Sequence, residues 1–446
     1  MNNKGNYGLF TAITMIAGTV IGSGIFFKSD DVLRYTNGNM VLGLLVFCIA
    51  AIAIIFGCLA ISQLATRTDK PGGMIAYAEE FINPKVASAF GWVQTFLYFP
   101  TSIAVVAWVS GMYTCQLFGI DGSNLVYCYI GAGFLVAFCA INMLTARLGA
   151  IFQNAAMIIK LIPLLLFAAV GMIWGNPTQI VSDNVELMKT TAVGTAWFAA
   201  FAPIAFSFDG WIVATNISHE IRDAKRNLPL ALIFAPILVL AAYLLYFAGL
   251  TSYVGPDVIL EKGDAAVAFA SMKVMGPMGA KAVLVFIIVS VLGTLNGLYT
   301  GLSRQPYSLA IRGFIPCKET LGKESKRFNN NPVNAGVFAT VIVLFWLVVH
   351  YFTVEAGMQG DVSEIAVCVS YLNYSALYVI VMKLTRKGEI KNKFMGYFVP
   401  VMAMVGAAVI LLGAMSNPLF PLYLLICFTV MAVGYYYAKQ VLAKTN

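Results

Sequence analysis

Two hydrophobic segments interrupted by glycine limit what this chain can fold into more than any other feature. One runs through Gly22-Ser23-Gly24 and the other through Asp209-Gly210. Each is long enough to cross a bilayer, yet each holds residues that favour an unwound backbone. A helix in lipid cannot leave backbone N–H and C=O groups unpaired, because each unpaired group costs several kcal/mol. Backbone that opens at membrane depth must therefore line a cavity or meet a ligand, as the broken helices of secondary transporters do.

Charged residues are few, and long apolar stretches separate them. Of the 446 residues, 60% are hydrophobic and 11% are charged, whereas a soluble domain carries about 25% charge. Residues 5–27, 35–66 and 86–120 contain no Asp, Glu, Lys or Arg, and each stretch exceeds the roughly 20 residues that span a hydrocarbon core. The composition predicts an all-α polytopic membrane protein.

Turn residues such as Gly175-Asn176-Pro177 and Asn227-Leu228-Pro229 divide the hydrophobic regions into twelve expected transmembrane helices. The first of them has no signal-peptide cleavage pattern, so we expect it to remain in the protein. The expected spans are residues 8–28, 40–65, 88–118, 124–146, 150–174, 192–216, 229–252, 279–303, 333–353, 362–383, 395–414 and 418–438.

The distribution of lysine and arginine predicts the orientation in the membrane. With the N-terminus on the cytoplasmic side, 21 of the 28 lysines and arginines fall in cytoplasmic segments. Six fall in outer segments, Lys28 among them, and Lys160 lies within a span. Since cytoplasmic loops carry an excess of positive residues, we expect a protein of the plasma (inner) membrane with both termini cytoplasmic.

The broken segments occupy the first and sixth spans, which indicates two five-helix units of opposite orientation. The expected units are residues 8–174 and 192–384, followed by two extra helices over residues 395–438. Inverted repeats of this kind hold their substrate near mid-membrane at the repeat interface. The whole chain, residues 1–446, is then a single transmembrane transporter domain.

Gly22, Ser23 and Gly24 are the expected binding residues of the first span. Glycine lets a ligand approach the backbone, and N–H groups freed at the start of a half-helix suit a carboxylate. The alternative is that these small residues form a helix-packing seam.

Asp209 places a charge inside the sixth span, where it costs roughly 2.5–3.5 kcal/mol on insertion scales. Carbonyls freed by a break at residues 206–209 would accept hydrogen bonds from an ammonium group. Together the first and sixth spans would fit a zwitterionic amino acid. The alternative for the Asp209 side chain is a position near water or a structural hydrogen bond.

Lys160 is an intramembrane lysine with no acidic residue nearby in its span, which by default marks a functional site. Its ammonium would contact freed carbonyls of the first span in place of a sodium ion, or it would titrate. Snorkelling to an interface is the alternative. Asn296 in the eighth span is a candidate pocket residue, although hydrogen bonding between helices is the commoner role.

Cysteine and histidine usage argues against a metal or redox site. The eight cysteines show no metal-site spacing, and the chain has only two histidines. No P-loop, nucleophile elbow or HExxH motif occurs in the sequence. We therefore expect no cofactor, no nucleic-acid partner and no enzymatic activity.

Four motifs occur in order: GTVIGSGIFF from Gly18, KPGGMIAYAEE from Lys70, FSFDGW from Phe206 and HEIRDAKRNLPLAL from His219. With them the chain resembles the amino acid–polyamine–organocation (APC) superfamily over essentially its whole length. It is most similar to the L-type amino acid transporters, including bacterial serine/threonine and alanine–serine–cysteine exchangers. The resemblance implies the LeuT fold and sodium-independent exchange of small neutral L-amino acids by alternating access.

The resemblance also implies roles for particular residues. Backbone N–H groups at Ser23 and Gly24 would meet the substrate carboxylate, and Phe206 would close over the substrate from outside. Lys160 would replace a sodium ion and link to the first span, and Tyr243 would take part in inner gating. The carbonyls implied to meet the amino group are those of Val20, Phe206 and Asp209.

Two features of this sequence, Asp209 and the loop at residues 119–123, differ from those of some family members. Asp209 stands where some eukaryotic members have glycine. The loop at residues 119–123 lacks the cysteine through which eukaryotic light subunits bond a heavy subunit, so no covalent heavy subunit is expected. A proton-coupled amino-acid symporter and, from a different class, a channel or receptor remain the alternative functions.

Overall fold

The computed structural model describes most of the chain, including both broken segments in large part. Ser23 and His219 lie outside the described residues. The described residues are 8–22, 24–68, 70, 72–144, 146–190, 194–212, 221–328, 331–358 and 361–445.

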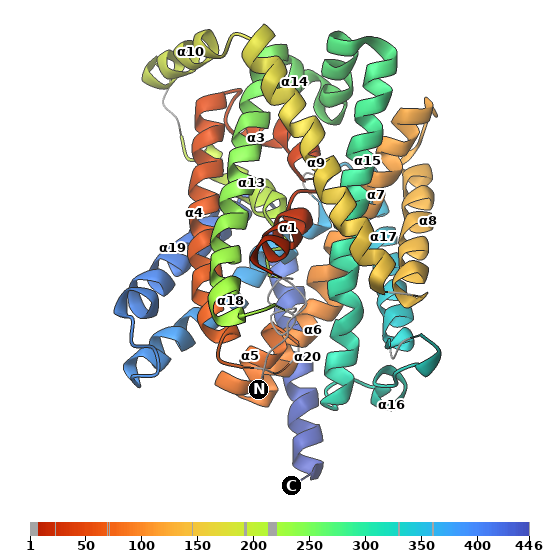
Figure 1. Ribbon diagram of the computed structural model, residues 1–446, viewed down its shortest axis with the longest axis vertical. Coiled ribbons are helices and arrows are strands. Elements are labelled where there is room, and N and C mark those ends of the chain that lie inside the picture. The colour runs from red at the N-terminus through yellow and green to blue at the C-terminus, as the bar shows by residue number, and fades with distance from the viewer. Residues whose placement is uncertain are drawn as a thin grey trace.

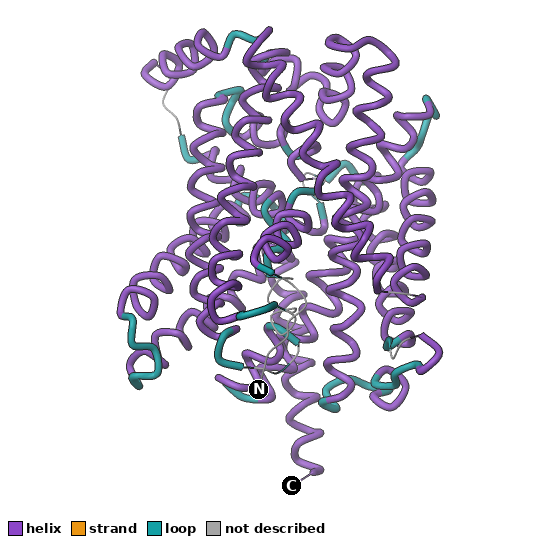
Figure 2. Tube along the Cα trace, viewed as in Figure 1, coloured by secondary structure: helices purple, strands orange, loops and turns teal. Residues whose placement is uncertain are grey.

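Within these ranges the fold is entirely helical, with no β-strand (Figure 2). Ten of the described helices are long and apolar enough to cross a membrane. Two shorter apolar helices, Leu9–Val20 and Ala196–Ser207, lie at the start of the first and sixth expected spans. The protein is therefore a multi-pass membrane protein. A total of twelve spans remains our prediction, with which the ten long and two short helices agree.

Both expected breaks appear as interruptions of helix. In the first span α1 (Leu9–Val20) stops, and the chain resumes as α2 (Gly24–Phe27) and α3 (Ser29–Tyr35). In the sixth span the 3-10 helix η2 (Ala196–Ala200) leads into α11 (Phe201–Ser207), which stops in turn. Figure 2 shows loop segments in the middle of the bundle as well as at its ends.

The remaining helices before α11 are α4 (Met40–Ala65), α5 (Met74–Phe81), α6 (Pro84–Val93), the π-helix η1 (Gln94–Tyr98), α7 (Phe99–Phe118), α8 (Asn124–Leu144), α9 (Ala146–Trp174) and α10 (Pro177–Thr190). Those after it are α13 (Ala224–Val254), α14 (Pro256–Lys262), η4 (Gly263–Ala265), α15 (Ala266–Ile311), α16 (Lys318–Leu321), η5 (Lys326–Phe328), α17 (Val333–Glu355), α18 (Val362–Arg386), the π-helix η6 (Phe394–Phe398), α19 (Val399–Ala414) and α20 (Phe420–Thr445).

One expected turn is wrong. Asn227-Leu228-Pro229 lies inside α13, which begins five residues before Pro229 and contains Pro236 as well. Proline is tolerated in membrane helices because neighbouring helices and polar side chains satisfy the backbone groups that it leaves free. By contrast, Gly175-Asn176-Pro177 does separate two helices, α9 and α10.

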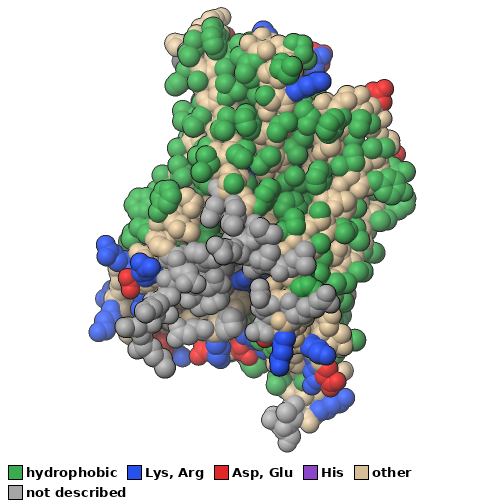
Figure 3. Space-filling view, turned by 45° about the vertical axis from the view of Figure 1, so that its right-hand side comes forward, with side chains coloured by type: hydrophobic (Ala, Val, Ile, Leu, Met, Phe, Trp, Pro, Cys, Tyr) green, Lys and Arg blue, Asp and Glu red, His purple; other side chains and the backbone are tan. Residues whose placement is uncertain are grey.

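The helix α1 occupies the centre of the bundle, where it packs against α13, α9 and α15 (Figure 1). Around it α13 packs on α9 and α4, and α15 packs on α7. Large apolar side chains such as Ile158, Phe345 and Leu425 are exposed on the outer helices. Figure 3 shows this apolar flank, with Lys and Arg gathered towards the ends of the molecule. The arrangement suits a lipid-facing exterior around an unwound centre.

The crossing of α9 and α13 depends on two glycines in direct backbone contact. A Cβ added at Gly249 would meet backbone atoms of Phe167 and Ala168, and one added at Gly171 would meet backbone atoms of Gly249. Small residues at such crossings let two membrane helices approach closely.

We therefore expect Gly249→Ala to lower the thermal midpoint of the detergent-solubilised protein, because forcing a methyl group into a packed contact costs about 1–3 kcal/mol. Gly133→Ala is the matched control, since an added Cβ there meets nothing within 4 Å. Gel-filtration recovery after a series of heating steps measures both variants. Equal midpoints for the two would contradict this account of the crossing.

Candidate functional site

The end of α1 is a helix terminus held at membrane depth. Ile21 has extended backbone angles, φ −68° and ψ 101°, and the helix stops at Val20. The last carbonyls of a helix have no partner within it, and they carry partial negative charge. Their partners must therefore come from other helices or from a ligand.

Lys160 of α9 supplies one of these partners. Its side chain is completely buried, and its ammonium donates hydrogen bonds to the Gly18 carbonyl at 2.5 Å and to Thr294 Oγ1 of α15 at 3.0 Å. Among the described residues no carboxylate forms an ion pair with it. The Thr294 hydroxyl lies 3.3 Å from the Ile21 carbonyl, to which it donates. At the negative end of α1, the Lys160 ammonium thus donates to the Gly18 carbonyl and the Thr294 hydroxyl donates to the Ile21 carbonyl.

Tyr243 of α13 joins the two breaks. Its hydroxyl lies 3.1 Å from the Val20 carbonyl and 2.8 Å from the Ser207 carbonyl, the last residue of α11. The ring is fully buried against Phe208 and Phe47, with centroids 5.1 Å and 6.2 Å away. One side chain therefore contacts the C-terminal carbonyls of both half-helices.

Glycine lets the two breaks meet. A Cβ added at Gly24 would lie 2.7 Å from the Ser207 Cα, closer than real Cβ atoms approach other atoms. One added at Gly22 would collide with the Thr294 side chain. In the sixth span Gly210 has φ +100° beside Thr19, a backbone conformation that favours glycine.

The break in the sixth span starts two residues later than expected, because α11 continues through Ser207. Phe206 still belongs to the last turn of α11, and its carbonyl accepts a hydrogen bond from the Asp209 N–H at 3.0 Å. The Phe206 side chain is 7% exposed. Its carbonyl is therefore engaged locally, by the turn that ends α11.

Asp209 accepts a hydrogen bond from the Tyr98 hydroxyl at 2.7 Å. Tyr98 ends the π-helical turn η1 of the third span, and such turns often occur at functional sites. Trp211, two residues after Asp209, packs against Tyr374 of α18 with ring centroids 5.2 Å apart. A carboxylate, hydroxyl groups and aromatic rings thus surround the second break.

Asn296 takes part in a contact between helices. Its Oδ1 accepts a hydrogen bond from Asn142 Nδ2 of α8 at 2.8 Å, and it is 2% exposed. This contact matches the alternative role that the sequence suggested for Asn296. Whether Asn296 also lines the substrate pocket stays a prediction.

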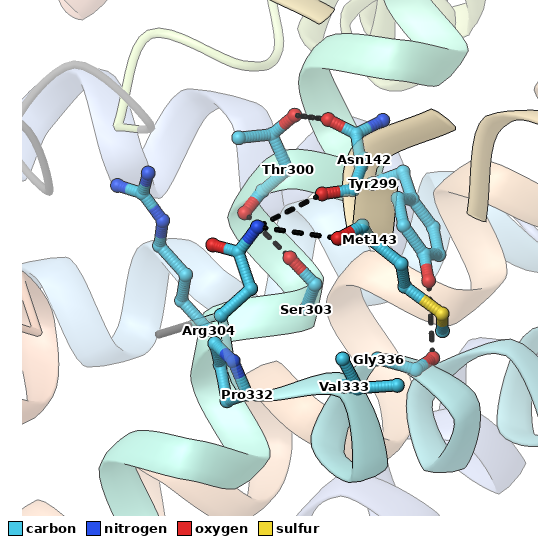
Figure 4. A pocket seen from close by; sticks show the side chains of 10 residues that line it. Asn142, Met143, Tyr299, Thr300, Ser303, Arg304, Pro332, Val333 and Gly336 are labelled. Atoms are coloured by element: carbon cyan, nitrogen blue, oxygen red, sulfur yellow. Dashed lines mark hydrogen bonds between the residues drawn. The ribbon is translucent and has the colours of Figure 1, made fainter. Parts of the chain in front are cut away.

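A small cavity of about 50 Å³ lies farther along α15, beyond Asn296 (Figure 4). Asn142 and Asn331 contribute to its wall, and the Asn331 amide donates to the Asn142 and Met143 carbonyls at 3.4 Å. These bonds cap the end of α8. The lining residues are Asn142, Met143, Tyr299, Thr300, Ser303, Arg304, Asn331, Pro332, Val333 and Gly336.

The residues expected in the site divide into three groups. Those at the meeting point of the breaks are Val20, Gly22, Gly24, Phe206, Asp209, Lys160 and Tyr243. Asn296 faces α8, and Ser23 lies outside the described residues.

Sequence reasoning missed two residues. Thr294 stands two positions from Asn296, within the same polar stretch of the eighth span, and that position was the available signal. Lys28 had been assigned to an outer segment, yet its side chain is 5% exposed and forms ion pairs with three carboxylates.

Comparison with known proteins shows which family the chain matches. A family model described as amino acid permease matches residues 7–439. The serine/threonine exchanger SteT of Bacillus subtilis (strain 168) is 28% identical, over 92% of this chain and 90% of its own length. The human b(0,+)-type amino acid transporter 1 is 26% identical, over 96% of this chain and 87% of its own length.

A solved structure shows the same fold. The crystal structure of MhsT in complex with L-phenylalanine is similar with a TM-score of 0.63 at 15% identity, covering 91% of this chain and 98% of that chain. This likeness confirms the expected all-helical, LeuT-like fold class.

The hydroxyl of Tyr243 should contribute measurably to stability. In Tyr243→Phe the buried carbonyls of Val20 and Ser207 lose their donor, at a cost of about 1–3 kcal/mol, while the ring packing is kept. We expect a lower thermal midpoint in detergent. Tyr129→Phe is the control, because Tyr129 is 69% exposed. If the two variants unfold at the same temperature, the hydroxyl does not hold the breaks together.

Proposed function

This chain belongs to the amino acid permease family, and we propose that within it the protein is a sodium-independent antiporter of small neutral L-amino acids. It would work by alternating access, with the substrate held at the unwound backbone of the first and sixth spans. The family, the amino acid substrate class and the non-enzymatic activity follow from the comparisons. The absence of a sodium requirement and the preference for small neutral substrates are the proposal.

The observation that carries the proposal is the position of the Lys160 ammonium. It lies 2.5 Å from the Gly18 carbonyl, next to the break in the first span, and is fully buried. A fixed positive charge at this carbonyl supplies what a bound sodium ion would otherwise supply. A transporter with such a tethered cation has no need to bind sodium for this purpose.

The substrate contacts follow the same backbone. We assign the carboxylate to N–H groups of Gly22, Ser23 and Gly24, at the positive start of the helix that follows the break. The ammonium would bind carbonyls at Val20, Phe206 and Asp209. Phe206 would cover the substrate from outside, and Asn296 would border its side chain.

The preference for small neutral substrates draws on the relative named as a serine/threonine exchanger.

We place the protein in the plasma (inner) membrane, with the end of α20 and the segment around α16 on the cytoplasmic side, since these lie at one end of the molecule (Figure 1) and carry many of the cationic residues. Because the loop between α7 and α8 has no cysteine, we expect no covalent heavy subunit.

Counterflow in proteoliposomes tests the exchange mechanism. Labelled serine or alanine should accumulate only in vesicles loaded with an unlabelled amino acid, and replacing sodium by choline should leave the rate unchanged. Equal uptake into empty vesicles under an inward proton gradient would instead establish the symporter alternative. Ion currents without stoichiometric exchange would establish a channel.

A second test concerns Lys160. In Lys160→Ala the Gly18 carbonyl and the Thr294 hydroxyl lose a buried partner, at a cost of about 1–3 kcal/mol. Since each 1.4 kcal/mol is a factor of ten, we expect turnover to fall up to roughly a hundredfold, with a smaller change in substrate binding. Initial exchange rates and substrate-dependent tryptophan fluorescence measure the two quantities.

The matched control is Lys281→Ala, because Lys281 is an exposed lysine of α15. It should exchange at the rate of the unaltered protein. A folded Lys160→Ala protein that also exchanges at that rate would disprove the role given to the tethered cation.

A further inference from the structure

The cavity at the end of α8 lies apart from the proposed substrate site, since none of the residues expected in that site lines it. Tyr299 and Gly336 in its wall are buried, whereas Arg304 is exposed, so the cavity reaches the surface. Among the described residues that line it, none is acidic. Its volume is about 50 Å³, and one water needs about 10–15 Å³. The cavity therefore has room for a phosphate-sized group.

Three polar side chains of α15 border the cavity (Figure 4). Thr300 stands three and four positions before Ser303 and Arg304, which places all three on one face of the helix. The Ser303 hydroxyl donates to the Thr300 carbonyl at 3.1 Å. This hydroxyl can turn to another acceptor, because a carbonyl inside a helix keeps its backbone partner. The Arg304 guanidinium has five N–H donors in a planar fork that matches phosphate.

The opposite wall is the start of α17, which adds to the positive potential. Pro332 caps this helix and Val333 begins it, and both line the cavity. The first N–H groups of a helix carry partial positive charge. The preceding turn is fixed by a hydrogen bond of 3.0 Å from the Ser325 N–H to the Asn331 carbonyl. Lys326, which is exposed, therefore lies in a short turn that ends at the cavity wall.

The connection from α15 to α17 is strongly basic. Residues 304–331 contain six lysines and arginines and two glutamates. Glu324 accepts a hydrogen bond from the Tyr307 hydroxyl at 2.5 Å, which ties the connection to α15. Arg312 pairs with Glu79 of α5 at 2.9 Å. Of the six cationic residues, Arg304 is the one that lines the cavity, and the net charge around it favours an anion.

An apolar stripe leads away from the cavity along α17. Val337 directly follows Gly336 of the cavity wall, and Val341, Phe345 and Val348 continue at intervals of three or four residues. This spacing places them on one face of the helix, and all four side chains are exposed. A phosphate in the cavity could thus carry an acyl chain that packs on this stripe. A phospholipid fits both features, whereas a free phosphate would use only the cavity.

We propose that the cavity binds the phosphate of an anionic phospholipid, with Arg304 as its main ligand and the stripe on α17 as the surface for an acyl chain. Basic pockets between membrane helices on the cytoplasmic side bind anionic headgroups. A headgroup held here contacts the ends of α8, α15 and α17 together. In the orientation given under the proposed function the lipid comes from the inner leaflet. Only the leaflet rests on that proposal.

Native mass spectrometry of the purified protein in detergent tests the site. Phosphatidylglycerol and phosphatidylcholine with the same acyl chains are titrated separately, and the retained lipid gives the apparent Kd of the tightest site. We expect phosphatidylglycerol to bind the more tightly. Arg304→Gln should weaken its binding about tenfold, because hydrogen bonds between arginine and phosphate are charge-assisted. Arg304→Lys, which keeps the charge but loses the fork, should restore part of the affinity.

The matched control is Arg226→Gln, which removes an exposed arginine of α13 that does not line the cavity. Its affinity should equal that of the unaltered protein. Val341→Ser should weaken lipid binding through the stripe alone. Inorganic phosphate should displace the lipid only at concentrations far above that of the lipid. Gel filtration confirms that each variant is folded.

Three results would overturn the proposal. The first is a folded Arg304→Gln protein with the affinity of the unaltered protein. The second is equal affinity for the two lipids. The third is displacement by inorganic phosphate at the concentration of the lipid itself, which would identify a site for free phosphate. Counterflow enters none of these measurements, so a failure of the antiport mechanism and a failure of the lipid site are distinguishable.

Discussion

The structure depends on how the backbone is satisfied where two helices stop inside the membrane. A stopped helix leaves carbonyls without partners, and lipid offers none. Here the partners are side chains from three different helices: Lys160 of α9, Tyr243 of α13 and Thr294 of α15. The unwound centre is therefore stable only while these helices stay packed around α1, and the site and the bundle form together.

The same requirement explains why charged residues occur at depth in so apolar a chain. Lys160 compensates carbonyl dipoles at the end of α1, whereas Lys28 compensates carboxylates from the second half of the chain. Lys160 donates to a backbone carbonyl and a hydroxyl, whereas Lys28 forms ion pairs with carboxylates.

Much of the fold could be predicted from the sequence, because its signals are local. Long uncharged stretches predicted the spans. Gly22-Ser23-Gly24 predicted the first break, and Asp209-Gly210 predicted the second to within a residue or two. Loop chemistry was less reliable: Asn227-Leu228-Pro229 is typical of a turn, yet it lies within α13, where tertiary packing outweighs local preference. Partners far apart in sequence could not be predicted. Glu364 lies 336 positions from Lys28, and nothing near Lys28 indicates that it is buried.

The Tyr243 hydroxyl has a single proton and faces two carbonyls, those of Val20 and Ser207. A hydroxyl can rotate about its C–O bond. The Tyr243 O–H can therefore switch its hydrogen bond from the Val20 carbonyl to the Ser207 carbonyl while the ring stays in place. The Tyr243 hydroxyl therefore links the half-helices α1 and α11 through a hydrogen bond that can change its acceptor. Small sliding of one break past the other would exchange one hydrogen bond for an equivalent one, at little cost in energy.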